Sequence, residues 1–177
     1  MSHKILVVDD ESANLRALER IFRHEHRVLT AGSGPEALAI LEHHDVALLI
    51  SDQRMPGMTG IELMQKTFQL RPHMVRILLT GYTDVSILIE AINCGHVYKY
   101  VTKPWNNDDL SVTVSRALEH FEANKTRHNL DMVNRRLRAR LSEISQLAND
   151  EELSDTRDTA LSQALEAERQ LNLIISN

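Results

Sequence analysis

The sequence contains a single cysteine, Cys94, and therefore cannot close a disulfide within one chain. This absence suits a reducing compartment, and we expect a cytoplasmic protein. Long apolar runs are also missing. The run that begins at Ile5 meets the acidic Asp9 too soon for a signal-peptide core or a membrane span, so we expect no membrane contact. The formal net charge is only −5, so no excess of one sign indicates a nucleic-acid or acidic-surface partner.

The 177 residues do contain a repeated alternation of strand and helix patterns. Apolar residues make up 42% of the chain, which suffices for the core of one domain with an appendage. Short apolar runs predict strands at Ile5 to Val8, Arg27 to Ala31, Val46 to Ile50, Met74 to Leu79 and Val97 to Val101. Helices are predicted at Ser12 to Phe22, after a cap at Ser33, around Ile61 to Phe68, at Thr83 to Cys94 and from about Asn106, where Asn107 or Asp108 is the expected cap. This alternation indicates a parallel sheet with helices on both faces.

Polar residues follow four of the predicted strands. They are Asp9 and Asp10, then Asp52, Thr80 and Lys103. A polar residue at one strand end is ordinary, but ligands of parallel sheets bind beyond the carboxyl ends of the strands. Three acids, a hydroxyl and an amine at that edge therefore form a specific combination that indicates a binding site.

The chemistry of this combination favours phosphoryl transfer. Two carboxylates about 4 Å apart repel by about 4 kcal/mol at an effective dielectric constant of 20, so a proton or a cation must lie between them. Oxygen ligands without His or Cys favour Mg²⁺. The cation, Lys103 and Thr80 together suit the oxygens of a phosphoryl group. Asp52 is then the nucleophile that forms an acyl phosphate.

Four motifs resemble the receiver domain of two-component response regulators, over Lys4 to about Phe121. They are ILVVDDE, LLISDQRMPGMTGIEL, ILLTGYTD and YKYVTKPW. The resemblance implies an α/β, flavodoxin-like, doubly wound sheet of five parallel strands in the order 2-1-3-4-5. It also implies that Asp52 is the phospho-acceptor, that Asp10 binds Mg²⁺ directly and Asp9 through water, and that the backbone carbonyl of Arg54 completes the metal site.

The same resemblance assigns a switch. Thr80 and Tyr100 match the hydroxyl and aromatic pair that rearranges on phosphorylation, which would reshape the face of the fourth helix, fifth strand and fifth helix. Lys103 is followed by Pro104, as in the family's Lys and typically cis proline. Arg54 and Tyr82 would flank the phosphate, and we hypothesise that they obstruct the attacking water and slow hydrolysis. The motifs are most similar to receivers that precede hydrogenase regulators and HD-GYP phosphodiesterases.

No glycine or proline follows Pro104, so one helix can run from about Asn107 to Leu147. We assign residues 1–122 to the receiver and 123–177 to a helical coiled-coil tail or linker, with a break near 149–158.

An apolar seam along this tail predicts a parallel homodimer through Leu130, Val133, Leu137, Leu141, Ile144 and Leu147. A last helix containing Leu161 and Leu171 could fold back on the basic helix or continue the seam. No helix-turn-helix pattern follows, so DNA binding is not expected.

We therefore predict a phosphorylated signalling receiver whose partner is a histidine kinase or a phosphotransfer protein. Its enzymatic chemistry would be limited to its own phosphorylation and dephosphorylation. Two alternatives stay open: the regulatory fragment of a longer output enzyme, such as a cyclic-di-GMP phosphodiesterase, or a stand-alone phosphorelay adaptor. A hydrolase of free phosphate esters is disfavoured, because the Asp-x-Asp of aspartyl phosphatases is absent after the first strand.

Overall fold

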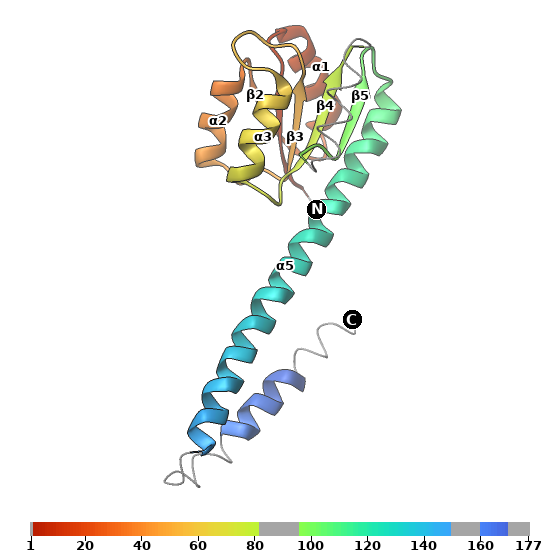
Figure 1. The fold of residues 1–177 in the computed structure, drawn as a ribbon. Coiled ribbons are helices and arrows are strands. Elements are labelled where there is room, and N and C mark those ends of the chain that lie inside the picture. The colour runs from red at the N-terminus through yellow and green to blue at the C-terminus, as the bar shows by residue number, and fades with distance from the viewer. Residues whose placement is uncertain (1, 82–95, 150–159, 170–177) are drawn as a thin grey trace. The chain divides into compact units, whose positions relative to one another are not determined.

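A computed structural model of the chain describes residues 2–81, 96–149 and 160–169. Its centre is a sheet of parallel strands in the order β2-β1-β3-β4-β5 (Figure 1). The strands are β1 (Lys4–Val8), β2 (Arg27–Ala31), β3 (Leu48–Asp52), β4 (Val75–Thr80) and β5 (Lys99–Thr102). This order confirms the predicted flavodoxin-like fold.

One strand boundary differs from the prediction at a functional residue. The sequence placed the end of the third strand at Ile50, before Asp52, whereas the predicted end of the fourth strand at Thr80 is confirmed. In the structure both polar residues belong to their strands, because Asp52 pairs with Leu79 and Thr80 pairs with Thr102. Asp52 and Thr80 therefore take part in the pairing of the sheet, so the site begins on the strands themselves.

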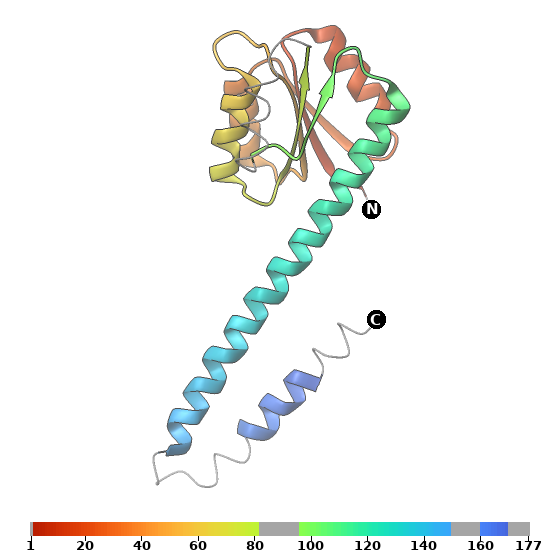
Figure 2. The ribbon, with the colours of Figure 1, turned by 45° about the vertical axis from the view of Figure 1, so that its right-hand side comes forward.

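Helices cover both faces of the sheet. They are α1 (Ser12–Phe22), α2 (Gly34–His43), α3 (Gly60–Leu70) and α5 (Asn107–Asn149). Figures 1 and 2 show α2 and α3 on one face, and α1 with the start of α5 on the other. Alternate strand residues feed the two cores, so Leu6 packs in one cluster and Ile5 in the other. The predicted helix at 83–94, with Cys94, lies outside the described residues.

Side-chain caps mark the start of α2, α3 and α5. Ser33 caps α2 as predicted, since its hydroxyl accepts the Glu36 N–H at 3.4 Å. A capping box at the start of α3, formed by Thr59 and Glu62, was not foreseen. The predicted cap of α5 was wrong, because the side chain of Asn106, rather than Asn107 or Asp108, accepts the first free backbone N–H groups.

The chain forms two compact units, Met1–Lys125 and Thr126–Asn177, and α5 contributes residues to both. The long helix predicted from Asn107 is confirmed, and Asn149 is still helical. The second unit also contains a helix over residues 160–169. This helix and α5 together line a groove through Leu137, Leu141, Ile144, Leu161, Ala164 and Leu165. The side chain of Leu147, the rest of the predicted break and Leu171 lie outside the described residues. No helix that the structure describes is long and apolar enough to cross a membrane.

Candidate functional site

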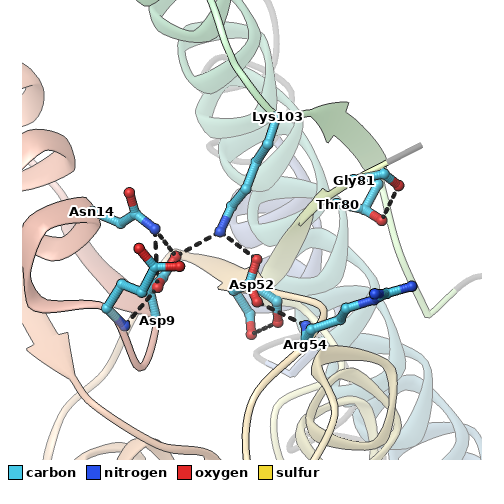
Figure 3. A network of polar contacts seen from close by, with 9 residues as sticks. Asp9, Asn14, Asp52, Arg54, Thr80, Gly81 and Lys103 are labelled. Atoms are coloured by element: carbon cyan, nitrogen blue, oxygen red, sulfur yellow. Dashed lines mark hydrogen bonds and ion pairs between the residues drawn. The ribbon is translucent and has the colours of Figure 1, made fainter. Parts of the chain in front are cut away.

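Three strands of the sheet, β1, β3 and β5, bring charged side chains to its carboxyl edge. Asp9 follows β1, Asp52 ends β3, and Lys103 follows β5. The Lys103 Nζ lies 2.9 Å from Asp9 Oδ2 and 2.5 Å from Asp52 Oδ1 (Figure 3). The structure therefore joins three of the predicted residues, which are far apart in the sequence, in one ionic network.

Asp9 is completely buried, and its carboxylate is surrounded by donors. Its Oδ1 accepts the Glu11 backbone N–H at 2.9 Å. The side-chain amide of Asn14 donates to both oxygens, at 3.2 Å and 3.0 Å. A buried carboxylate without partners is expensive, so these contacts, with Lys103, allow Asp9 to remain at the end of β1.

Asp52 is 6% exposed and is fixed by the turn that follows it. Its Oδ2 accepts the Arg54 backbone N–H at 2.7 Å. Gln53 folds the turn back, because its side-chain Oε1 accepts the Ile61 N–H at 3.1 Å and its carbonyl accepts the Gly60 N–H at 3.0 Å. A Cβ on Gly60 would lie 2.2 Å from the Asp52 carbonyl oxygen, so this close approach requires glycine.

Electrostatics favour the charged form of Lys103. Burial alone would lower the pKa of its ammonium, but hydrogen bonds and charges from Asp52 and Asp9 outweigh burial and raise the pKa above its ordinary value. Asp10 lies exposed beside Asp9. Three carboxylates and one ammonium leave two negative charges at this edge, which matches a divalent cation. The peptide bond between Lys103 and Pro104 is cis.

Of the predicted switch residues, Thr80 ends β4 at the same edge and Tyr100 lies within β5. The Thr80 hydroxyl is buried and donates to the Gly81 carbonyl at 3.0 Å (Figure 3). Tyr100 is 43% exposed on β5. Arg54 follows Asp52 in the turn, where its side chain is exposed. Tyr82 lies outside the described residues.

The donor set fits Mg²⁺ by its chemistry. Carboxylates of Asp9, Asp10 and Asp52 and a backbone carbonyl are the hard oxygen ligands that this ion prefers. Within residues 2–81, 96–149 and 160–169, no three His, Cys, Asp or Glu side chains are grouped closely enough to hold a metal. Instead, the ammonium of Lys103 lies between two of the acids.

Two residues of this site were missed by sequence reasoning. Asn14 contacts Asp9, and Gln53 ties the turn after Asp52 to α3. The position of Asn14, about one helical turn beyond Asp9 and Asp10, was a usable signal, because the first turn of a helix lies against the strand end before it. Gln53 gave no such signal, since its role depends on a turn whose path the sequence does not reveal.

Comparison with known proteins places these residues in a family. The response regulator receiver domain matches residues 5–115. The hydrogenase transcriptional regulatory protein HoxA of Cupriavidus necator is 41% identical over 128 residues. The match covers 72% of this chain and 27% of HoxA, so the chain spans about a quarter of the length of this curated relative.

Solved structures give the same result. The signal receiver domain of an HD domain-containing protein from Pseudomonas fluorescens Pf-5 is 33% identical, with a TM-score of 0.68, and the match covers 71% of this chain and 93% of that one. An adenylate cyclase structure from Rhodopirellula baltica is 33% identical with a TM-score of 0.71, over 73% and 97% of the two chains. The hydrogenase regulator and the HD domain protein confirm the subtype that the motifs predicted.

Proposed function

Because the chain belongs to the response regulator receiver domain family, we propose that it accepts a phosphoryl group on Asp52 as part of a two-component system. One observation carries the proposal: the Lys103 ammonium is held between Asp9 and Asp52 at the carboxyl ends of β1 and β3. A cation beside a nearly buried carboxylate can neutralise the oxygens of an incoming phosphoryl group. The donor would be a phosphohistidine of a kinase or a phosphotransfer protein.

The proposed reaction has two steps: a phosphoryl group passes from the donor to Asp52, and later from Asp52 to water. A carboxylate oxygen of Asp52 attacks phosphorus, the phosphorus–nitrogen bond of the phosphohistidine breaks, and its electron pair stays on the imidazole nitrogen. In hydrolysis, a water oxygen attacks phosphorus and the bond to the Asp52 oxygen breaks. The Asp52 carboxylate is regenerated, and inorganic phosphate leaves, while the protons of the water pass to the phosphate or to solvent. The proposed chemistry is limited to phosphorylation and dephosphorylation of the protein itself.

Mg²⁺ would be held by Asp10, Asp52 and the carbonyl of Arg54, with Asp9 acting through water. When bound, it supplies positive charge for the phosphoryl oxygens. Thr80 would rotate from the Gly81 carbonyl to donate to a phosphoryl oxygen. Tyr100 would then turn inward from its exposed position. This rearrangement of β5 and the adjoining face is the proposed signal, because the added charge favours one arrangement of the edge.

Intact mass measurement after treatment with acetyl phosphate tests the proposal. Wild type should gain the mass of one phosphoryl group in the presence of Mg²⁺ and not after its removal by a chelator. Asp52→Asn should gain nothing. The control Asp45→Asn changes an exposed aspartate outside the site and should behave as wild type. A phosphoryl adduct that survives Asp52→Asn would contradict the assignment of the acceptor.

Arg54 and Tyr82 are proposed to slow hydrolysis by obstructing the attacking water. Arg54 supplies the backbone N–H that contacts Asp52, so its side chain can be removed without losing that bond. Arg54→Ala and Tyr82→Ala should each shorten the lifetime of the phosphorylated protein, measured as phosphate release. An unchanged rate in both variants would refute this role.

We further propose that residues 1–122 form the receiver and 123–177 a helical tail that pairs two copies. The seam would consist of Leu130, Val133, Leu137, Leu141, Ile144 and Leu147. Three of these residues also line the groove shared with residues 160–169, so the last helix and a second copy use the same apolar side chains. Phosphorylation would act on the pairing through β5 and α5.

A second candidate is the regulatory part of a longer output protein. It is favoured by the 27% coverage of HoxA and by the HD domain protein whose receiver this chain resembles. The position of the stop codon in the gene separates a longer regulator from a stand-alone adaptor. HoxA is named a transcriptional regulatory protein, so nucleic acid becomes a candidate partner of such a longer protein, against our expectation from the sequence. A gel-shift assay with the full native protein would test that partner.

A further inference from the structure

Asn14 has a defined place in the site that the family resemblance did not assign. We infer that Asn14 is a positioning residue, whose amide fixes the buried Asp9 carboxylate so that Lys103 and a divalent cation can share the edge of the sheet. The inference rests on the proposed function, because it concerns the cation that supports phosphorylation of Asp52.

The geometry around Asp9 gives each carboxylate oxygen two donors. Oδ1 accepts from the Glu11 N–H and from Asn14, and Oδ2 accepts from Asn14 and from Lys103. Figure 3 shows the Asn14 amide and the Lys103 ammonium approaching the carboxylate from different sides. The amide of Asn14 is therefore the contact that opposes the pull of Lys103 and sets the rotation of the carboxylate about the Cβ–Cγ bond of Asp9.

This rotation matters because Lys103 is shared. Its ammonium contacts Asp9 and Asp52 together, so a turn of the Asp9 carboxylate would displace the ammonium relative to Asp52. A fully buried carboxylate with four contacts also has little freedom to move an oxygen toward a metal ion. Asp9 thus acts as a fixed anchor, while the exposed Asp10 has the freedom to bind the ion directly.

The chemical type of Asn14 is as important as its position. An amide donates hydrogen bonds without carrying charge, so Asn14 stabilises Asp9 and leaves the two excess negative charges of the edge for the divalent cation. A cationic residue here would compete with the metal, and an acid would repel Asp9. Partners that orient metal-binding groups typically change metal affinity 10- to 100-fold when removed, roughly the range expected for Asn14.

The test measures Mg²⁺ binding to the full chain by isothermal titration calorimetry. Asn14→Ala and the similarly sized Asn14→Leu should weaken binding about tenfold or more, because both remove the donor. The matched control Asn124→Ala removes an exposed amide that contacts His120 and should bind as wild type. In addition, phosphorylation by acetyl phosphate should need more Mg²⁺ for half its maximal rate in the Asn14 variants.

The outcomes separate this inference from the function on which it rests. Wild-type affinity in both Asn14 variants overturns the inference and leaves the proposed function intact. Wild type that binds no Mg²⁺ overturns both. Circular dichroism and thermal unfolding accompany each titration, and a loss of fold in both variants would assign Asn14 a purely structural role and overturn the inference.

Discussion

At the scale of single residues, the ammonium of Lys103 compensates two carboxylates that the fold buries. Its side chain is 25% exposed, whereas those of Asp9 and Asp52 are nearly inaccessible to water. Removing one partner of such a network leaves the other charges without compensation, which costs more than the net value of the contact. Lys103 should therefore contribute to stability as well as to phosphoryl transfer.

Lys103→Met should lower the free energy of unfolding by about 2 kcal/mol in urea denaturation at neutral pH. Mg²⁺ should restore part of this loss, and should stabilise the variant more than wild type, because the ion supplies the missing positive charge. Lys99→Met, which removes an amine that contacts Thr113, serves as the control. Equal stabilisation of wild type and Lys103→Met by Mg²⁺ would argue against a shared site.

The pH dependence of this contact has a definite sign. The pKa of Lys103 is raised above its ordinary value of 10.5, so the folded state binds the proton more tightly than the unfolded state. Its contribution is fully present below the ordinary pKa and is lost as the pH rises through the higher pKa of the folded state. The stability difference between wild type and Lys103→Met should therefore be constant near neutral pH and shrink only above 10.5.

The ionic residues of the site could be predicted from the sequence, because strand ends alone place them. Asp9, Asp52 and Lys103 meet since parallel strands share one carboxyl edge. Asn14 and Gln53 could not be predicted as reliably, because their contacts depend on how far a side chain reaches across a turn. The sequence predicted Mg²⁺ between the acids, and that stays a prediction; in this structure the ammonium of Lys103 lies between Asp9 and Asp52.

At the scale of elements, Arg76 joins β4 to the end of α3. The residue is 3% exposed, and its guanidinium donates to the carbonyls of Thr67, Arg71 and Met74 at 2.7, 2.5 and 2.5 Å. It also lies 5.3 Å from the centre of the Phe68 ring. Burial lowers the pKa of Arg76 to about 10, so the group stays charged at neutral pH. The carbonyls at the negative end of α3 therefore compensate this charge.

Arg76→Ala should destabilise the receiver by about 3 kcal/mol, measured by urea denaturation, because it leaves several buried carbonyls without donors. Arg76→Lys should recover only a small part of this lost stability, because the single ammonium of lysine cannot donate to all three carbonyls that the planar guanidinium contacts. Arg20→Ala changes an exposed arginine on α1 and should have little effect. An effect of Arg76→Ala no larger than that of Arg20→Ala would contradict this account.

The identity of the described elements could be predicted more securely than their ends. Apolar runs located the strands because both faces of the sheet are buried. The ends depended on single hydrogen bonds, such as the side chain of Asn106 at the start of α5 or the pairing of Asp52 with Leu79. Such bonds leave no periodic trace in a sequence.

At the scale of the whole molecule, the receiver unit and the tail unit differ in how far the sequence specifies their structure. In the receiver, the same four motifs predict both the order of the strands and the residues of the site. In the tail, the seam leaves Leu141 47% exposed and Val133 38% exposed, which is a large apolar exposure for a surface helix. The sequence left open whether the last helix folds back or continues the seam, and residues of both helices of the tail unit line one groove.

Pairing through the seam predicts a specific defect. Leu141→Lys should shift the protein toward the monomer in sedimentation equilibrium, because it places a charge in the apolar seam. Met132→Lys changes a side chain of similar exposure outside the seam and should leave the assembly unchanged. Circular dichroism checks that the helices persist. A dimer of undiminished stability in Leu141→Lys would exclude this seam as the interface.

The central claim is that Asp52 carries the phosphoryl group, and chemical trapping tests it most directly. Borohydride reduces an acyl phosphate of aspartate to homoserine, which peptide mass spectrometry locates within the sequence. After acetyl phosphate and Mg²⁺, we predict homoserine at position 52, and none when Mg²⁺ is withheld. Homoserine at Asp9 or Asp10 instead, or at no position in a protein shown to be folded, would contradict the account.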